Sequence, residues 1–145
     1  MNINKSLLTV VLLAGVVFYS TTTLFAQSSS DKVIASWSHK SIVTTVACKL
    51  YQTDDADGKK LIYVANNDGE VTRYSWKISD VTSIDTIDTD FITVCTSQSV
   101  TKEFSSKIPG NNHTGTRDCA PLEFDPSDKA TRSTVLEKLK ALTGK

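Results

Sequence analysis

The chain has 145 residues, and its 16 basic and 16 acidic side chains give a formal net charge of zero. Proteins that bind nucleic acids concentrate basic residues on one face, so this balance argues against a nucleic-acid partner. The length suits one domain with a modest hydrophobic core.

Residues 1–26 have the pattern of an export signal. Lys5 is their only charged side chain, an uncharged and mostly apolar run follows over residues 6–19, and the small residue Ala26 precedes Gln27. The apolar run is shorter than the ~20 residues that a membrane span requires. We predict cleavage after Ala26 and a secreted or periplasmic product with no membrane span. An uncleaved N-terminal anchor is the alternative.

Residues 27–32 contain no apolar side chain and predict a flexible lead-in to one domain over residues 33–145. Alternating or β-branched residues predict strands at 33–37 and 41–52, with His39 in the turn between them. Three aspartates in residues 54–58 suggest calcium, but the position where the helix–loop–helix calcium pattern requires glutamate holds Val64. We predict a solvated hairpin turn there.

Residues 61–78 predict the central hairpin of the fold. Asn67-Asp68-Gly69 is the strongest turn signal in the chain, because these residue types tolerate a left-handed backbone. Tyr74 and Trp76 alternate with polar residues, which predicts one buried face on the second strand.

Residues 79–90 predict a turn, with at most one short helical turn. A strand is predicted at 91–96, and a further edge strand within 97–108. The polar, glycine-containing loop at 109–118 is our candidate binding segment, because such loops often carry function. The side chains we expect to bind are Asn111, Asn112, His113 and Arg117. The run Asn112-His113-Thr114 also matches the acceptor pattern for N-glycosylation.

Residues 126–143 predict the one clear helix. Asp125 can cap its N-terminus, Pro126 suits the first helical position, and Gly144 suits the stop. The chain therefore predicts an α+β fold, in which an antiparallel sheet of about five or six strands packs against this C-terminal helix. An all-β barrel or sandwich with a peripheral helix is the alternative.

Three cysteines remain after signal cleavage, so one disulfide leaves one thiol over. We predict a Cys95–Cys119 bridge, with Cys48 as a buried thiol because it falls on the apolar side of its strand. A Cys48–Cys95 bridge is the next alternative. An intermolecular bridge through the odd cysteine is a third.

No established catalytic motif is present, and the chain has only two histidines, His39 and His113. The one conceivable nucleophile–base pair is Cys119 with His113. We therefore predict no catalytic residues, no metal and no cofactor.

The combination of export, small size and missing catalytic signatures predicts a soluble, non-catalytic binding module for a protein or glycan partner. A self-assembling structural subunit of an extracellular assembly is the alternative. It is motivated by the odd cysteine and by uneven charge, with nine acidic and four basic residues in 54–90 against one and five in 129–145. A small hydrolase is the third hypothesis.

Overall fold

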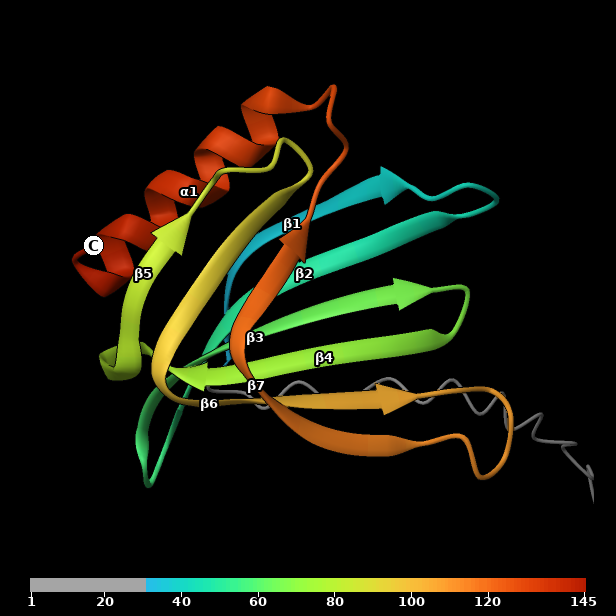
Figure 1. Ribbon diagram of the computed structural model, residues 1–145, viewed down its shortest axis with the longest axis horizontal. Helices are drawn as coiled ribbons and strands as arrows, with labels where there is room; N and C mark the ends of the chain where they lie inside the picture. The colour runs from blue at the N-terminus through green and yellow to red at the C-terminus, as the bar shows by residue number, and fades with distance from the viewer. Residues whose placement is uncertain (1–30) are drawn as a thin grey trace, which may run out of the picture.

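The computed structural model describes residues 31–145. The predicted signal peptide and most of the predicted lead-in lie outside the described residues. Seven strands form one antiparallel sheet that curls into a half-barrel around a C-terminal helix (Figure 1). The elements are β1 (Lys32–Lys40), β2 (Thr45–Asp55), β3 (Gly58–Asn67), β4 (Glu70–Lys77), a short 3₁₀ turn η1 (Ile78–Asp80), β5 (Val81–Asp85), β6 (Phe91–Ser105), β7 (His113–Glu123) and α1 (Lys129–Thr143).

The predicted α+β architecture is confirmed. The sheet order is β1-β2-β3-β4-β6-β5, and β7 pairs with the remaining edge of β6. The predicted number of strands was too low because two strands lie in segments that we expected to be turn or loop. Residues 79–90 contain β5, and the predicted loop at 109–118 contains the first half of β7.

The predicted central hairpin is present. Asn67 pairs with Glu70, and the two residues between them have positive φ angles of 50° at Asp68 and 86° at Gly69. Two consecutive residues with positive φ match the right-handed twist of the flanking strands, which is why this turn forms a tight hairpin. Tyr74 and Trp76 are buried as the alternation predicts.

The expected strand at 41–52 was placed too early, because β2 begins at Thr45. Residues 41–44 form a loop closed by a 2.8 Å hydrogen bond from the Ser41 amide to the Thr44 carbonyl. Ile42 and Val43 at its tip are almost fully exposed, at 99% and 87%. The β-branched content correctly indicated a strand from Thr45 onward, but residues 41–44 bend because they have no strand partner among the described residues.

Strand β6 replaces the two separate strands expected between residues 91 and 108. Its first half pairs with β5 and its second half with β4, while β7 runs along the other edge of both halves. The register with β7 shifts between Cys95 and Val100, and this irregularity lets β6 bend from one part of the half-barrel to the other.

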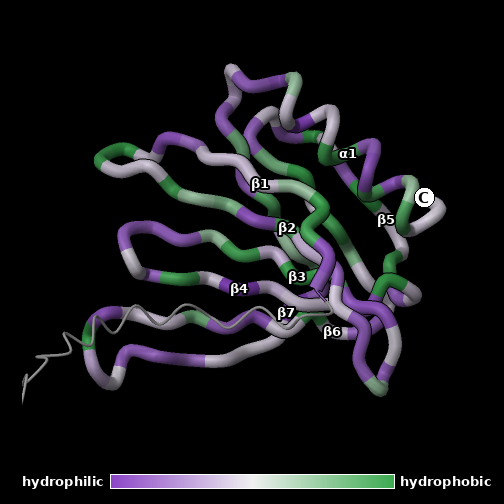
Figure 2. Tube along the Cα trace, turned by 180° about the vertical axis from the view of Figure 1, so that it is seen from behind, coloured by the Kyte–Doolittle hydropathy of each residue, from purple (hydrophilic) through white to green (hydrophobic). Residues whose placement is uncertain are grey.

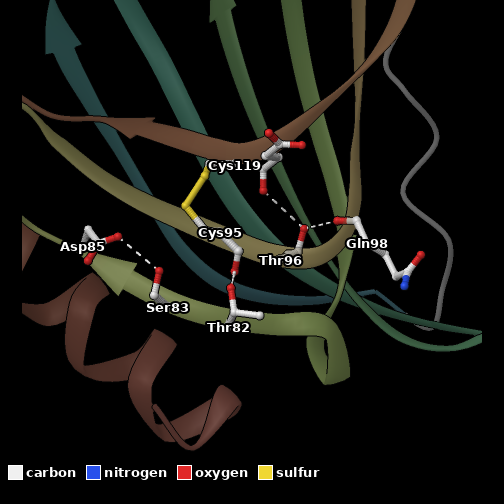
Figure 3. The surroundings of a disulfide bond; sticks show 8 residues. Thr82, Ser83, Asp85, Cys95, Thr96, Gln98 and Cys119 are labelled. Carbon is white, nitrogen blue, oxygen red and sulfur yellow. Dashed lines mark hydrogen bonds between the residues drawn. A yellow bond between two sulfur atoms is a disulfide. The ribbon is translucent and has the colours of Figure 1, made fainter.

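A disulfide bond joins Cys95 to Cys119 directly beside this irregularity, which confirms the predicted pairing (Figure 3). The Thr82 hydroxyl donates to the Cys95 carbonyl at 3.1 Å, and the Thr96 hydroxyl donates to the Gln98 carbonyl. The bridge and these hydrogen bonds hold the strands together where regular pairing is interrupted.

Helix α1 begins three residues later than predicted. Its N-cap is Asp128, whose side chain accepts a 3.1 Å hydrogen bond from the Thr131 amide. The assignment of Asp125 as cap and of Pro126 as first helical residue was therefore wrong. Asp125 instead accepts from the Ser127 amide and hydroxyl in a preceding turn. The helix ends as predicted, because Gly144 adopts a left-handed conformation at the C-cap.

Helix α1 covers one end of the inner face of the sheet. Val135 and Leu139 are buried there, and the Lys138 ammonium group donates to the Ile34 carbonyl at 2.8 Å. The hydrophobic segments gather around α1 and the strands it covers, and the β1–β2 loop carries a separate apolar tip (Figure 2). Within residues 31–145, no helix is both long enough and apolar enough to cross a membrane.

Candidate functional site

The inner face of the half-barrel is open at the end opposite α1, where the β1–β2, β3–β4 and β6–β7 connections lie (Figure 1). Strand pairing arranges the inward side chains of this end in three rows across the sheet. The deep row is Leu50, Tyr63, Tyr74, Lys102 and Gly115; the middle row is Trp37, Cys48, Ala65, Thr72, Phe104 and His113; the outer row is His39, Val46, Asn67 and Glu70.

A cleft of about 500 Å³ lies over these rows, and we call it the groove. It is lined by the whole outer row and by Ala65, Thr72 and Phe104 of the middle row. It reaches the deep row at Tyr63, Tyr74 and Lys102, and Glu123 adds a carboxylate. The groove thus combines aromatic rings with charged and hydroxyl groups, which is typical of sites that fix a polar ligand in one orientation.

The end of β7 forms the wall of the groove on the β1 side. The Trp37 indole donates to the Glu123 carbonyl at 2.8 Å, and the Glu123 amide donates to the Tyr63 hydroxyl at 3.2 Å. These two side chains satisfy backbone groups that a strand partner would otherwise satisfy. The sheet is therefore closed between β7 and β1 by side chains rather than by strand pairing.

A row of near-parallel rings supports this wall. Phe124 and Trp37 stack with ring centroids 4.7 Å apart, Trp37 and Tyr63 follow at 5.8 Å, and Tyr63 and Tyr74 at 6.2 Å. Stacked aromatic pairs at such separations stabilise a packed arrangement beyond the area that they bury. The floor and wall of the groove are consequently joined by direct ring contacts.

His39 lies in β1 and faces the groove, so its prediction as a turn residue was wrong. Its Nε2 atom is 3.3 Å from a Glu123 carboxylate oxygen, yet it has no aligned hydrogen-bond partner among the described residues. The side chain of His39 is 10% exposed, whereas that of Glu123 is 46% exposed. A buried polar atom without a hydrogen bond is uncommon in folded proteins and marks this corner of the groove.

Cys48 is the buried free thiol that its strand position predicts. Its sulfur lies 3.3 Å from the Tyr63 hydroxyl oxygen. Burial raises the pKa of the Cys48 thiol to about 11, and burial likewise raises the pKa of Tyr63. Both groups are therefore neutral at physiological pH. Because the odd cysteine is buried, it is not placed to form the intermolecular bridge that we considered.

We expect Cys48 in the folded protein to react with iodoacetamide at least about 100-fold more slowly than a free cysteine at pH 8. A pKa of about 11 instead of 9.0 lowers the thiolate fraction by about two orders of magnitude, and burial restricts access further. The rate is measured by mass spectrometry in native buffer, with the urea-unfolded protein as control. Equal rates in the two states would show that the thiol is exposed.

The structure separates the four predicted binding residues into two pairs. Asn111 and Asn112 lie on the exposed β6–β7 loop, where the Asn112 side chain accepts a 2.9 Å hydrogen bond from the Ser106 amide. His113 and Arg117 lie on β7 and face inward, in register with Phe104 and Val100. Neither His113 nor Arg117 lines the groove, but each contacts a residue that does: the His113 ring lies beside Phe104, and the Arg117 guanidinium donates to Tyr74. A binding role for any of the four stays a prediction.

Sequence reasoning did not identify Lys102, Glu123 and Thr72 as neighbours of one site. Each belongs to a different strand, and strand register alone brings them together. The alternation around Tyr74 was the one available signal, since it identified the inner face of β4. Nothing local in the sequence shows that β7 returns toward β1.

The candidate nucleophile–base pair is contradicted, because Cys119 is bridged to Cys95 and has no free thiol. Within residues 31–145, no three His, Cys, Asp or Glu side chains are grouped so that they could hold a metal ion. The side chains that line the groove can form hydrogen bonds, pair with charges and stack on rings.

Comparison with known proteins gives no match. No family model matches the chain, and neither a curated protein nor a solved structure is significantly similar to it.

Proposed function

We propose that this protein is an exported, non-catalytic binding module that holds a glycan or protein partner in the groove. The observation that carries the proposal is the open cleft of about 500 Å³, in which Phe104 and Tyr74 lie beside exposed polar and charged groups. The open end of a curved sheet is a common place for a ligand site. A stack of packed rings lies below it, and a preorganised site loses less entropy on binding.

Two features support export. Residues 1–26 have the composition of a cleavable signal, and the Cys95–Cys119 bridge is of a kind that persists in oxidising compartments outside the cytoplasm. Intact-mass measurement of the protein from its natural source tests this part. A mature chain that begins at Gln27 is the expected result.

The groove is tested by filling it. Thr72 lines the groove and is half-buried, so Thr72→Trp places a large side chain across its floor. Thr114 is exposed and faces the other side of the sheet, so Thr114→Trp is the matched control. Wild-type protein is screened on an array of neutral and acidic oligosaccharides and against a displayed peptide library.

We expect any partner found in the screen to bind the Thr72→Trp variant at least about tenfold more weakly than it binds the wild type. Its affinity for the Thr114→Trp variant should equal its affinity for the wild type. Urea denaturation checks that both variants fold. A partner that binds the Thr72→Trp variant normally but does not bind the Thr114→Trp variant would place the site on the outer face of the sheet. A wild-type protein that binds no saccharide and no peptide would count against the binding module altogether.

Self-association is the second candidate, favoured by one observation. Within residues 31–145, the outer edge of β7 over residues 113–118 pairs with no strand. Exposed strand edges offer backbone groups to another chain. A concentration-dependent increase in sedimentation coefficient would support it, whereas a constant monomer value at high concentration would exclude it.

A further inference from the structure

We infer that the ligand of the groove is an acidic saccharide, that is, a sugar bearing a carboxylate such as a uronic acid. This inference rests on the proposed function and adds the chemistry of the ligand. Three groups of contacts carry it: two cations without acidic partners, an aromatic platform beside them, and a set of exposed hydrogen-bond acceptors.

The cations are Lys102, which lines the groove, and Arg117, which lies just outside its lining, and both contact Tyr74. The Lys102 ammonium lies 5.9 Å from the centroid of the Tyr74 ring, and an Arg117 guanidinium nitrogen donates to the Tyr74 hydroxyl at 3.2 Å. Two positive charges are thus held beside one ring. They repel each other, and an anion bound between them would offset that repulsion.

Within residues 31–145, three basic side chains outside the groove have the carboxylate partner that Lys102 and Arg117 lack. Lys60 pairs with Asp55 at 2.6 Å, Arg73 with Glu103 at 3.7 Å on the outer face, and Lys107 with Asp68 at 3.2 Å in the connecting loops. Among the described residues, Lys102 and Arg117 have no carboxylate within 4.0 Å. An anionic ligand would provide the partner, and arginine is suited to a carboxylate because its planar fork can donate two parallel hydrogen bonds.

The platform is Phe104, two residues beyond Lys102 on the same inward face of β6. Its ring centroid lies 4.9 Å from that of His113. Residues two apart on a strand are separated by about 7 Å, so one sugar ring can lie on Phe104 while its carboxylate meets Lys102. The apolar face of a pyranose packs on aromatic rings in the way that other apolar surfaces do.

The acceptors decide between a sugar and an apolar carboxylate such as a fatty acid. The Asn67 side-chain oxygen already accepts a hydrogen bond from the Thr44 hydroxyl. The remaining acceptors are Glu123, which is 46% exposed, and Glu70, which lies exposed in the outer part of the groove. These groups accept hydrogen bonds from hydroxyls, whereas an alkyl chain would remove them from water without replacing their hydrogen bonds. A saccharide carries both kinds of group: its hydroxyls can donate to these acceptors, and its carboxylate can pair with Lys102 and Arg117.

The test compares two ligands that differ only in charge. The probe is a tetramer of galacturonic acid, and its control is the same tetramer after chemical reduction of the carboxyl groups to alcohols. Binding to the disulfide-bonded chain of residues 27–145 is measured by titration calorimetry at low and physiological salt. We expect the acidic tetramer to bind at least about tenfold more tightly than the reduced one, and salt to weaken only the former.

Two variants locate the charge. Lys102→Gln and Arg117→Gln remove the inferred partners, and Lys107→Gln is the control because it removes an equal charge outside the groove. We expect Lys102→Gln and Arg117→Gln each to lower the affinity for the acidic tetramer by about tenfold. The control should change that affinity by less than twofold.

The possible results separate this inference from the proposed function. Equal binding of both tetramers, with no effect of Lys102→Gln but loss in Thr72→Trp, would overturn the acidic ligand and keep the groove as a binding site. Failure of both tetramers to bind would overturn the saccharide inference, and the array and peptide screen would then decide on the groove itself. Weakening by Lys107→Gln as strong as that by Lys102→Gln would show general charge attraction only.

Discussion

Replacing Trp37 by alanine is expected to lower the free energy of unfolding by about 3 kcal/mol. The substitution removes the ring that stacks between Phe124 and Tyr63, at 4.7 and 5.8 Å. It also leaves the Glu123 carbonyl without its indole donor. Because this contact joins β7 to β1, we expect Trp37→Ala also to weaken binding in the groove. Urea denaturation followed by circular dichroism measures the loss.

The matched variant is Trp37→Phe, which keeps a ring in the stack and removes the hydrogen bond. We expect it to cost about 1 kcal/mol, the usual value of one such bond. It leaves Trp76 as the only tryptophan, and since Trp76 is 3% exposed, acrylamide should quench its fluorescence weakly. Equal losses for Trp37→Phe and Trp37→Ala would mean that the stack contributes little and the hydrogen bond most.

Removing the disulfide by the double substitution Cys95→Ala and Cys119→Ala is expected to cost about 3 kcal/mol. The bridge spans a sequence separation of 24 residues, and its loss gives the unfolded chain conformational freedom that the bridge removes. We expect a lower urea midpoint, with the register shift between Cys95 and Val100 as the first place where β6 and β7 separate. Hydrogen exchange along β6 and β7 reports that opening.

Cys48→Ala is the control for the double substitution. It removes a small buried thiol, so we expect a smaller loss than removal of the bridge causes. The bridge itself is checked by intact mass after thiol blocking. A chain two hydrogens lighter than the reduced form, with one blocked thiol, is expected, while a peptide map linking Cys48 to Cys119 would contradict the structure.

The elements predicted correctly are those whose determinants lie close together in the chain. The Asp68-Gly69 turn depends on two residues that tolerate positive φ, and the inner face of β4 follows from the alternation of Tyr74 and Trp76. The helix was recognised from residues that suit its two ends, and Gly144 does end it. Its cap is Asp128 and not Asp125, because Asp128 accepts from the Thr131 amide in the first turn of α1, whereas Asp125 accepts from Ser127 in the turn before it.

The strands that were missed depend on distant partners. β5 is five residues long and pairs only with the first half of β6, so its mixed sequence was not recognisable as a strand. The first half of β7 is polar and exposed on its outer edge, and it is extended because β6 lies beside it. Strand pairing between segments far apart in sequence overrides the weak local preferences of such residues.

Most of the strands, the C-terminal helix and the Cys95–Cys119 bridge could be predicted from the sequence, and the structure confirms them. Which side chains share the groove could not be predicted, because it depends on how the sheet folds. Lys102, Glu123 and His39 come from three strands, and the curl of the sheet together with the return of β7 to Trp37 brings them to one cleft. Local preferences depend on neighbours in the chain, whereas a site of this kind depends on register and curvature, which are set by the packing of the whole sheet.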